Sequence, residues 1–232
     1  MPQLRVRNDA ALLGIAHPAA CLISNVRITS SSIELEAEIA WLMRRLANAE
    51  QTILNRPEVH GFRELFGQMG YRAPTPAGHR LIESLRQRGF NRYNNVIDAC
   101  NVSSALFGSG LGIHDALFCA RGHCDIHVYR ARGDETILPL FRDKRVTVNA
   151  GDLVYGFEGR EMTLLAWLGK RDVDSDDFKV KNDTSSLLLV ALGNTKTSEK
   201  YNTDTCEKTV ELMRLSCPTI AAQFLDIVFY PH

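Results

Sequence analysis

The spacing of hydrophobic residues changes near residue 120, and this change limits the folds open to the chain. Before it, after one or two short strands within the first 30 residues, helical spacing dominates residues 33–48, 60–69, 81–85 and 94–107. After it, short apolar runs predict strands at 125–131, 136–141, 146–148, 153–157, 162–168 and 187–192. Helical spacing returns from Val210 to Ile227. Helices and strands that occupy separate parts of a chain are typical of an α+β fold.

The chain has 232 residues and no internal repeat or low-complexity linker. This length suits one large domain, or one medium domain with extensions. We therefore expect an N-terminal extension with a long helix (1–54), a central domain (55–195) and a C-terminal helical extension packed on that domain (196–232).

The charge composition excludes a global attraction to polyanions. Lys and Arg number 27, as do Asp and Glu, so the formal net charge is zero. Binding to nucleic acid would need a local basic patch, and no apolar run approaches the length of a membrane span. The six cysteines follow no regular framework. In a chain of this length they favour reduced thiols and a cytoplasmic location.

Three potential metal ligands lie close together in the sequence, at Cys119, His123 and Cys124. A closed zinc site needs four ligands, and no second pair with suitable spacing supplies the fourth. We therefore expect no metal and no other cofactor, and interpret these thiols as structural.

Residues 94–115 hold the densest group of polar residues with chemical potential. The pattern predicts a helix that ends at the glycine-rich turn 108–110 and places Asp98 and Asn101 on one face. A buried Asp98 needs hydrogen-bond donors, supplied either by the adjacent loop or by a ligand. Cys100 with His114 could form a nucleophile and base, although a cysteine inside a helix is more often a small hydrophobic residue.

Arginines and aromatic residues alternate between residues 71 and 93. Arginine forms paired hydrogen bonds with phosphate, and aromatic rings can stack on bases, so this segment is a candidate RNA-binding surface. A solvated helix face explains the same pattern. The candidate RNA-binding residues are Arg80, Arg86, Arg88 and Arg92.

The segment NNVIDACN, followed by LGIHD, resembles the signature of the tRNA-binding and editing (B3/B4) domain of the phenylalanyl-tRNA synthetase β chain. It is still more similar to the freestanding single-domain relatives. The resemblance covers roughly residues 55–195 and implies an α+β fold with a mixed sheet and flanking helices. It also implies a pocket that admits a wrongly attached amino acid on the tRNA end and hydrolyses the ester without a metal.

The resemblance assigns roles to individual residues of this chain. Gly112 stands where the synthetase has its site histidine, and His114, two residues later, could substitute for it. The catalytic residues implied are Asn101, Asp172 and His114. The substrate-binding residues implied are Asp98, Cys100, Gly112, Asp115 and Ala191.

Three functional hypotheses follow. The chain could hydrolyse mischarged aminoacyl-tRNA, or it could bind tRNA or an amino-acid-like small molecule without catalysis. It could also be an accessory protein that binds another enzyme through the inherited pocket. No hypothesis involves a membrane.

Overall fold

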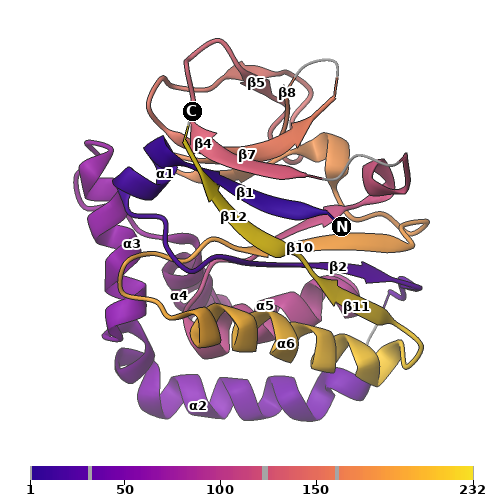
Figure 1. Cartoon of the computed structure of the whole chain (residues 1–232). Helices are drawn as coiled ribbons and strands as arrows, with labels where there is room; N and C mark the ends of the chain where they lie inside the picture. The colour runs from indigo at the N-terminus through magenta and orange to yellow at the C-terminus, as the bar shows by residue number, and fades with distance from the viewer. Residues whose placement is uncertain (1, 31–32, 122–124, 160–161, 232) are drawn as a thin grey trace.

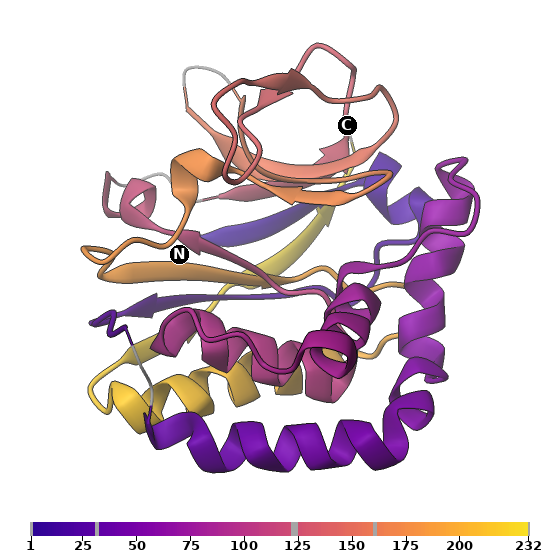
Figure 2. The ribbon, with the colours of Figure 1, turned by 180° about the vertical axis from the view of Figure 1, so that it is seen from behind.

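The structure, a computed structural model, describes residues 2–30, 33–121, 125–159 and 162–231 and combines a layer of helices with two main sheets (Figures 1 and 2). The α-helices are α1 (Asn8–Leu13), α2 (Glu36–Leu54), α3 (Pro57–Gln68), α4 (Ala77–Arg88), α5 (Asn95–Phe107) and α6 (Glu199–Ser216). The strands are β1 (Gln3–Arg7), β2 (Ala19–Ser24), β3 (Gly112–Asp115), β4 (Ile126–Arg130), β5 (Thr136–Ile137), β6 (Val146–Thr147), β7 (Leu153–Glu158), β8 (Met162–Leu168), β9 (Asp172–Asp174), β10 (Ser186–Ala191), β11 (Ala221–Phe224) and β12 (Asp226–Tyr230). Short 3₁₀ turns cover Ile33–Leu35, Leu117–Arg121 and Asp176–Phe178.

The two main sheets differ in strand direction. The six-stranded sheet has the order β12-β1-β4-β7-β8-β9 and is mixed, because β1 pairs in parallel with β12 and β4 while the remaining pairs are antiparallel. The four-stranded sheet has the order β11-β2-β10-β3 and is antiparallel throughout. This mixed architecture with flanking helices confirms the predicted α+β class.

The central strand β10 explains the layering. Successive side chains of a strand point to opposite faces. Leu187, Leu189 and Ala191 accordingly pack in the core against α2, α4, α5 and α6, whereas Leu188 and Val190 pack in the core shared with the six-stranded sheet. A strand covered on both faces needs apolar residues at every position, which accounts for the run LLLVA. The four-stranded sheet is therefore the middle layer, as Figure 2 shows.

The helices agree with the sequence pattern, with shifts at their ends. The helix expected at 33–48 begins with a 3₁₀ turn and continues as α2 to Leu54, with non-helical backbone angles at Ala49. The helix expected at 94–107 is α5: Asn94 caps it by accepting hydrogen bonds from the backbone N–H groups of Val96 and Ile97. Gly108, in the left-handed conformation at φ 71°, ends it.

The C-terminal segment differs from the expectation. We predicted helix from Val210 to Ile227, but α6 ends at Ser216 and residues after it form β11 and β12. β12 lies beside β1 in the six-stranded sheet, and β11 lies beside β2 in the other. Both ends of the chain thus contribute strands to the main sheets, while the division at residues 54 and 195 remains a prediction.

Within the described residues, no helix combines the length and apolarity needed to cross a membrane. Four cysteines, Cys21, Cys100, Cys206 and Cys217, are buried free thiols. Cys119, which we interpreted from the sequence as a structural thiol, is half-buried, and Cys124 lies outside the described residues.

Candidate functional site

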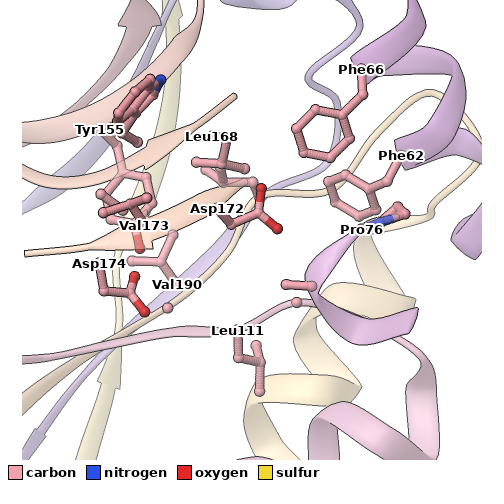
Figure 3. Close-up of a pocket in the computed structure, with 16 residues that line it drawn as sticks. Phe62, Phe66, Pro76, Leu111, Tyr155, Leu168, Asp172, Val173, Asp174 and Val190 are labelled. Carbon is pink, nitrogen blue, oxygen red and sulfur yellow. The ribbon is translucent and has the colours of Figure 1, made fainter. Parts of the chain in front are cut away.

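A pocket opens where the two sheets meet α3 and the start of α4 (Figure 3). It holds about 570 Å³ of space, counting the part open to solvent. The residues that line it are Phe62, Phe66, Pro76, Ala77, Gly110, Leu111, Gly112, Tyr155, Ala166, Trp167, Leu168, Asp172, Val173, Asp174, Val190 and Leu192.

Two carboxylates stand out in this mostly apolar lining. Asp172 and Asp174 lie two positions apart on β9, so both project from the same face of the strand, with Cα atoms roughly 6.6 Å apart. Figure 3 shows both carboxyl groups among the lining side chains. Burial raises the pKa of Asp172 to about 6, and burial together with the charge of Asp172 raises the pKa of Asp174 to about 7.

The two carboxylates differ in their partners. Asp172 accepts hydrogen bonds from the guanidinium of Arg80, at 3.1 Å, and from the backbone N–H of Ala77 at the start of α4. Its second oxygen is buried without a partner among the described residues. For the carboxylate of Asp174, the described part of the chain provides neither an ion pair nor a hydrogen bond. The pocket therefore contains a half-buried carboxylate that no cation of the described residues neutralises.

A histidine and a tyrosine form a hydrogen-bonded pair beside these carboxylates. The Nε2 atom of His114 on β3 lies 2.7 Å from the hydroxyl oxygen of Tyr155 on β7, and both side chains are buried. Burial lowers the pKa of His114 to about 3, so its ring is neutral. The Nδ1 atom has no partner among the described residues. Burial and the two aspartates raise the pKa of Tyr155 well above 10, so its hydroxyl keeps its proton.

Gly112 leaves the space that the tyrosine hydroxyl occupies. A Cβ atom at position 112 would lie 1.8 Å from that hydroxyl oxygen and 3.1 Å from Nε2 of His114. Any other residue at this position would displace the tyrosine. In this chain, the Tyr155 hydroxyl therefore stands where a side chain from position 112 would begin.

A third acidic residue, Asp152, holds side chains close to the pocket. Asp152 accepts hydrogen bonds from the indole N–H of Trp167 at 2.7 Å, from the hydroxyl of Tyr71 at 2.7 Å and from the amide of Asn149 at 3.2 Å. This network fixes the indole of Trp167, which packs with Val154 on the face of the sheet opposite Tyr155 and Ala166.

The structure brings part of the predicted site together. Gly112 and Asp172 line the pocket, and His114 lies directly behind Tyr155. Cys100 lies near Asp174, whose charge, together with burial, raises the pKa of the thiol to about 12. The thiol stays protonated, so this environment does not suit a nucleophile.

Other predicted residues lie outside the pocket lining. Asp98, whose side chain is 1% exposed, accepts a hydrogen bond from the backbone N–H of Tyr93 and lies 3.5 Å from Arg92, which makes it a clamp on that loop. Asp115 accepts hydrogen bonds from Thr184 and from the backbone of Leu117.

Two further predicted residues are also outside the lining. Ala191 faces the helical core, while its neighbours Val190 and Leu192 line the pocket. Asn101 is half-buried on α5 and is not a lining residue.

The predicted RNA-binding arginines are largely paired within the chain. Arg80 pairs with Asp172, Arg86 with Glu50, and Arg92 with Glu36 and Asp98. Arg88 is exposed at the end of α4. These pairs leave less positive charge on the surface than the sequence alone indicates.

Among the described residues, no cluster of three or more His, Cys, Asp or Glu side chains could hold a metal ion. Of the three ligands considered from sequence, Cys119 lies in a 3₁₀ turn, while His123 and Cys124 lie outside the described residues.

Sequence reasoning missed two pocket residues, Asp174 and Tyr155. We expected residues 172–183 to be a polar connection, but their first three residues form β9. The alternation Asp172-Val173-Asp174 was a detectable sign of a strand with both carboxylates on one face. Tyr155 lies in a predicted strand, but the meeting of β7 with β3 is a tertiary contact that local spacing does not reveal.

The structure is that of an α+β protein with a pocket between two sheets and a helical layer. The chain belongs to the B3/4 domain family, whose profile matches residues 66–212. This match confirms the family resemblance carried by residues 94–115.

A solved structure supports the fold. The chain is similar to an N-terminal fragment of the phenylalanyl-tRNA synthetase β-subunit from Pyrococcus horikoshii, with a TM-score of 0.51 and 9% sequence identity over 98% of this chain. The match covers 52% of that fragment, so this chain spans about half of its length. No curated protein matches the chain.

Proposed function

We propose that this protein binds the aminoacyl end of a mischarged tRNA in the pocket and hydrolyses its ester bond. The observation that carries the proposal is the carboxylate of Asp174, half-buried in the pocket beside Asp172 without a cationic partner among the described residues. A buried, unpaired carboxylate is costly, and a ligand cation would offset that cost. The α-ammonium group of an aminoacyl ester is such a cation.

The apolar lining suggests the class of amino acid. Phe62 and Phe66 from α3 supply aromatic surface to the pocket. Aromatic and large apolar side chains bury well against such surfaces. We therefore expect amino acids with aromatic or large aliphatic side chains to be accepted in preference to charged ones.

Asp172 suits the activation of water. Arg80 and the start of α4 favour its ionised form, while burial keeps its pKa near 6, close to neutral pH. Asp172 accepts a proton from water as the water oxygen bonds to the ester carbonyl carbon. When the bond to the ribose oxygen breaks, that oxygen takes the proton. The products are the free amino acid and the tRNA with its terminal hydroxyl restored.

The comparisons support this proposal at the level of family and fold. The B3/4 family profile covers the pocket strands, and the similar structure is part of a β-subunit of phenylalanyl-tRNA synthetase. Aminoacyl-tRNA as the ligand also implies a cytoplasmic protein with no membrane partner.

The test is hydrolysis of a panel of mischarged aminoacyl-tRNAs by the purified protein. Asp172→Asn and Asp174→Asn are compared with Asp183→Asn, which changes an exposed carboxylate outside the pocket. We expect release of the amino acid above the buffer rate, loss in the first two variants and full activity in the third. Release that survives both pocket substitutions, or no release from any substrate, would contradict the proposal.

A second candidate is an accessory protein that binds an amino-acid-derived group, or a partner enzyme, without catalysis. The ion pairs of Arg80, Arg86 and Arg92 favour it, because they neutralise much of the surface expected to attract tRNA. Salt titration of tRNA binding separates the two candidates. If the protein hydrolyses aminoacyl-tRNA, its binding of tRNA should weaken as the salt concentration rises. Arg88→Gln should also reduce this binding. Binding of the free amino acid without any tRNA binding would favour the accessory role.

A further inference from the structure

We propose that Tyr155 binds the carbonyl oxygen of the ligand and that His114 is the positioning residue that aims its hydroxyl. This inference rests on the proposed function and adds a hydrogen-bond donor to a pocket in which the carboxylates are acceptors. Tyr155 lines the pocket, and its hydroxyl contacts the ring of His114, which is fully buried behind it.

The hydrogen-bond partners of His114 indicate the direction of the bond between the two residues. If Tyr155 donated to Nε2, the proton of the neutral imidazole would be on Nδ1, where the described residues provide no acceptor. A buried N–H group without a partner is rare and costly. If the proton is on Nε2, that N–H donates to the tyrosine oxygen, and only an acceptor lone pair on Nδ1 is left unpaired. The second arrangement leaves the tyrosine O–H available for another acceptor.

The electrostatic field of the pocket favours the same arrangement. Asp172 and Asp174 both lie close enough to Tyr155 to raise its pKa. Their negative charge attracts the hydroxyl hydrogen toward the pocket and away from the imidazole. In addition, a hydroxyl that accepts one hydrogen bond becomes a stronger donor in the next. Tyr155 is thus prepared to donate a hydrogen bond to a ligand.

The acceptor on the ligand is its ester carbonyl. With the ammonium group at Asp174 and the attacking water at Asp172, two oxygens remain on the reacting carbon, and the carbonyl oxygen is the stronger acceptor of the two. That oxygen gains negative charge as the water oxygen bonds to the carbon. A donor that keeps its own proton at all relevant pH values can stabilise this charge without being deprotonated. The raised pKa of Tyr155 provides this property.

Gly112 makes this arrangement possible. The 1.8 Å separation between a Cβ at position 112 and the tyrosine oxygen means that a side chain there and the Tyr155 hydroxyl exclude each other. The tyrosine therefore supplies, from β7, a polar group at a place that a residue on β3 would otherwise occupy.

The test uses two ligands that cannot be hydrolysed. One is adenosine with L-tyrosine attached to its 3′ position through an amide, and the other has a methylene group in place of the carbonyl. Binding of both is measured by calorimetry to the wild type, Tyr155→Phe and Tyr129→Phe. Tyr129 is the matched control, since it is buried on the adjacent strand β4 and its hydroxyl has no hydrogen-bond partner among the described residues.

We expect Tyr155→Phe to weaken binding of the amide about tenfold, with no change for the methylene ligand, and Tyr129→Phe to change neither. An equal effect of Tyr155→Phe on both ligands, or no effect on either, would overturn the role of Tyr155 while leaving the proposed function intact. If the wild type binds neither ligand, the proposed function itself fails, and this inference with it.

His114 is tested by two substitutions in the same assay. Gln at position 114 can place an N–H donor near the position of Nε2, whereas Leu cannot. We expect His114→Gln to retain the preference for the amide and His114→Leu to lose it, with thermal unfolding used to verify that both variants fold. If both variants kept the preference for the amide ligand, His114 would not be the residue that positions Tyr155.

Discussion

Two acidic sites lie on either side of Trp167, and they are built in opposite ways. Asp152 is 3% exposed and accepts hydrogen bonds from three side chains, including the indole of Trp167. Asp174 lies in the pocket that Trp167 lines, and its carboxylate has no partner among the described residues. Asp152 is buried and receives donors in return, whereas Asp174 is half-buried and receives none from the described residues.

The difference separates a structural role from a functional one. A satisfied buried carboxylate stabilises the fold, whereas an unsatisfied one costs stability and is retained where a ligand completes it. Removal of the first should therefore weaken the protein, and removal of the second should strengthen it while abolishing activity.

Asp152→Ala should have the largest effect. It leaves the indole N–H of Trp167 and the hydroxyl of Tyr71 without their acceptor. We expect a loss of about 3 kcal/mol in the free energy of unfolding, measured by urea denaturation. Asp183→Ala, an exposed substitution, is the control. A loss below about 1 kcal/mol would mean that Asp152 is not a structural residue.

Asp174→Asn should stabilise the protein, by an amount that depends on pH. The pKa of Asp174 is about 7 in the folded protein, against 3.8 for the ordinary carboxyl. The folded state binds more protons between these values, so this group lowers stability as pH rises from about 4 to about 7. Asparagine removes that loss. We expect the variant to exceed the wild type by about 2 kcal/mol at pH 8 and by much less at pH 5.

In this measurement, the stability of Asp174→Asn must be compared with that of the wild type at each pH. His114 has a lowered pKa, so it makes the protein more stable as pH rises from about 3 toward 6.5, which opposes the effect of Asp174. Because His114 is present in both proteins, its contribution cancels in the difference. An equal difference in stability at pH 5 and pH 8 would show that Asp174 is not a desolvated carboxylate.

Gly112→Ala should have an intermediate effect. The added methyl group would overlap the hydroxyl of Tyr155, so that side chain must move away from His114. We expect a loss of about 1.5 kcal/mol in stability and a larger relative loss of hydrolysis. Gly67→Ala is the matched control, since a Cβ at that position in α3 would meet nothing within 4 Å. If Gly112→Ala kept full activity, the Tyr155 hydroxyl would have no role in hydrolysis.

Arg80→Gln should have the smallest effect on stability, below about 1 kcal/mol, because the guanidinium is 38% exposed. Its effect on catalysis is more specific. Arg80 lowers the pKa of Asp172, so its removal should move the acidic limb of the pH–rate profile upward by about one unit. A profile that does not move would exclude Asp172 as the group that accepts the proton from water.

The sequence predicted the layers better than the site. Asn94 and Gly108 define α5 through local rules for helix ends, and those rules operate within a few residues. The end of the chain was mispredicted, because β12 is fixed by pairing with β1 across more than 200 residues and not by its own spacing. The same reason hides the contact of His114 with Tyr155, which joins strands of different sheets.

The position of β1 has a consequence for the order in which the fold can form. This strand lies between β12 and β4, and both neighbours are parallel to it. Leu4 pairs with Ile126 on one side and with Ile227 on the other, so β1 has no partner in its sheet until more than 100 further residues are made. Such distant pairing slows folding, since long loops must close before it yields any contact. The six-stranded sheet is therefore complete only after β12 is made, and until then Leu4 and Val6, which are fully buried in the finished fold, lack part of their cover.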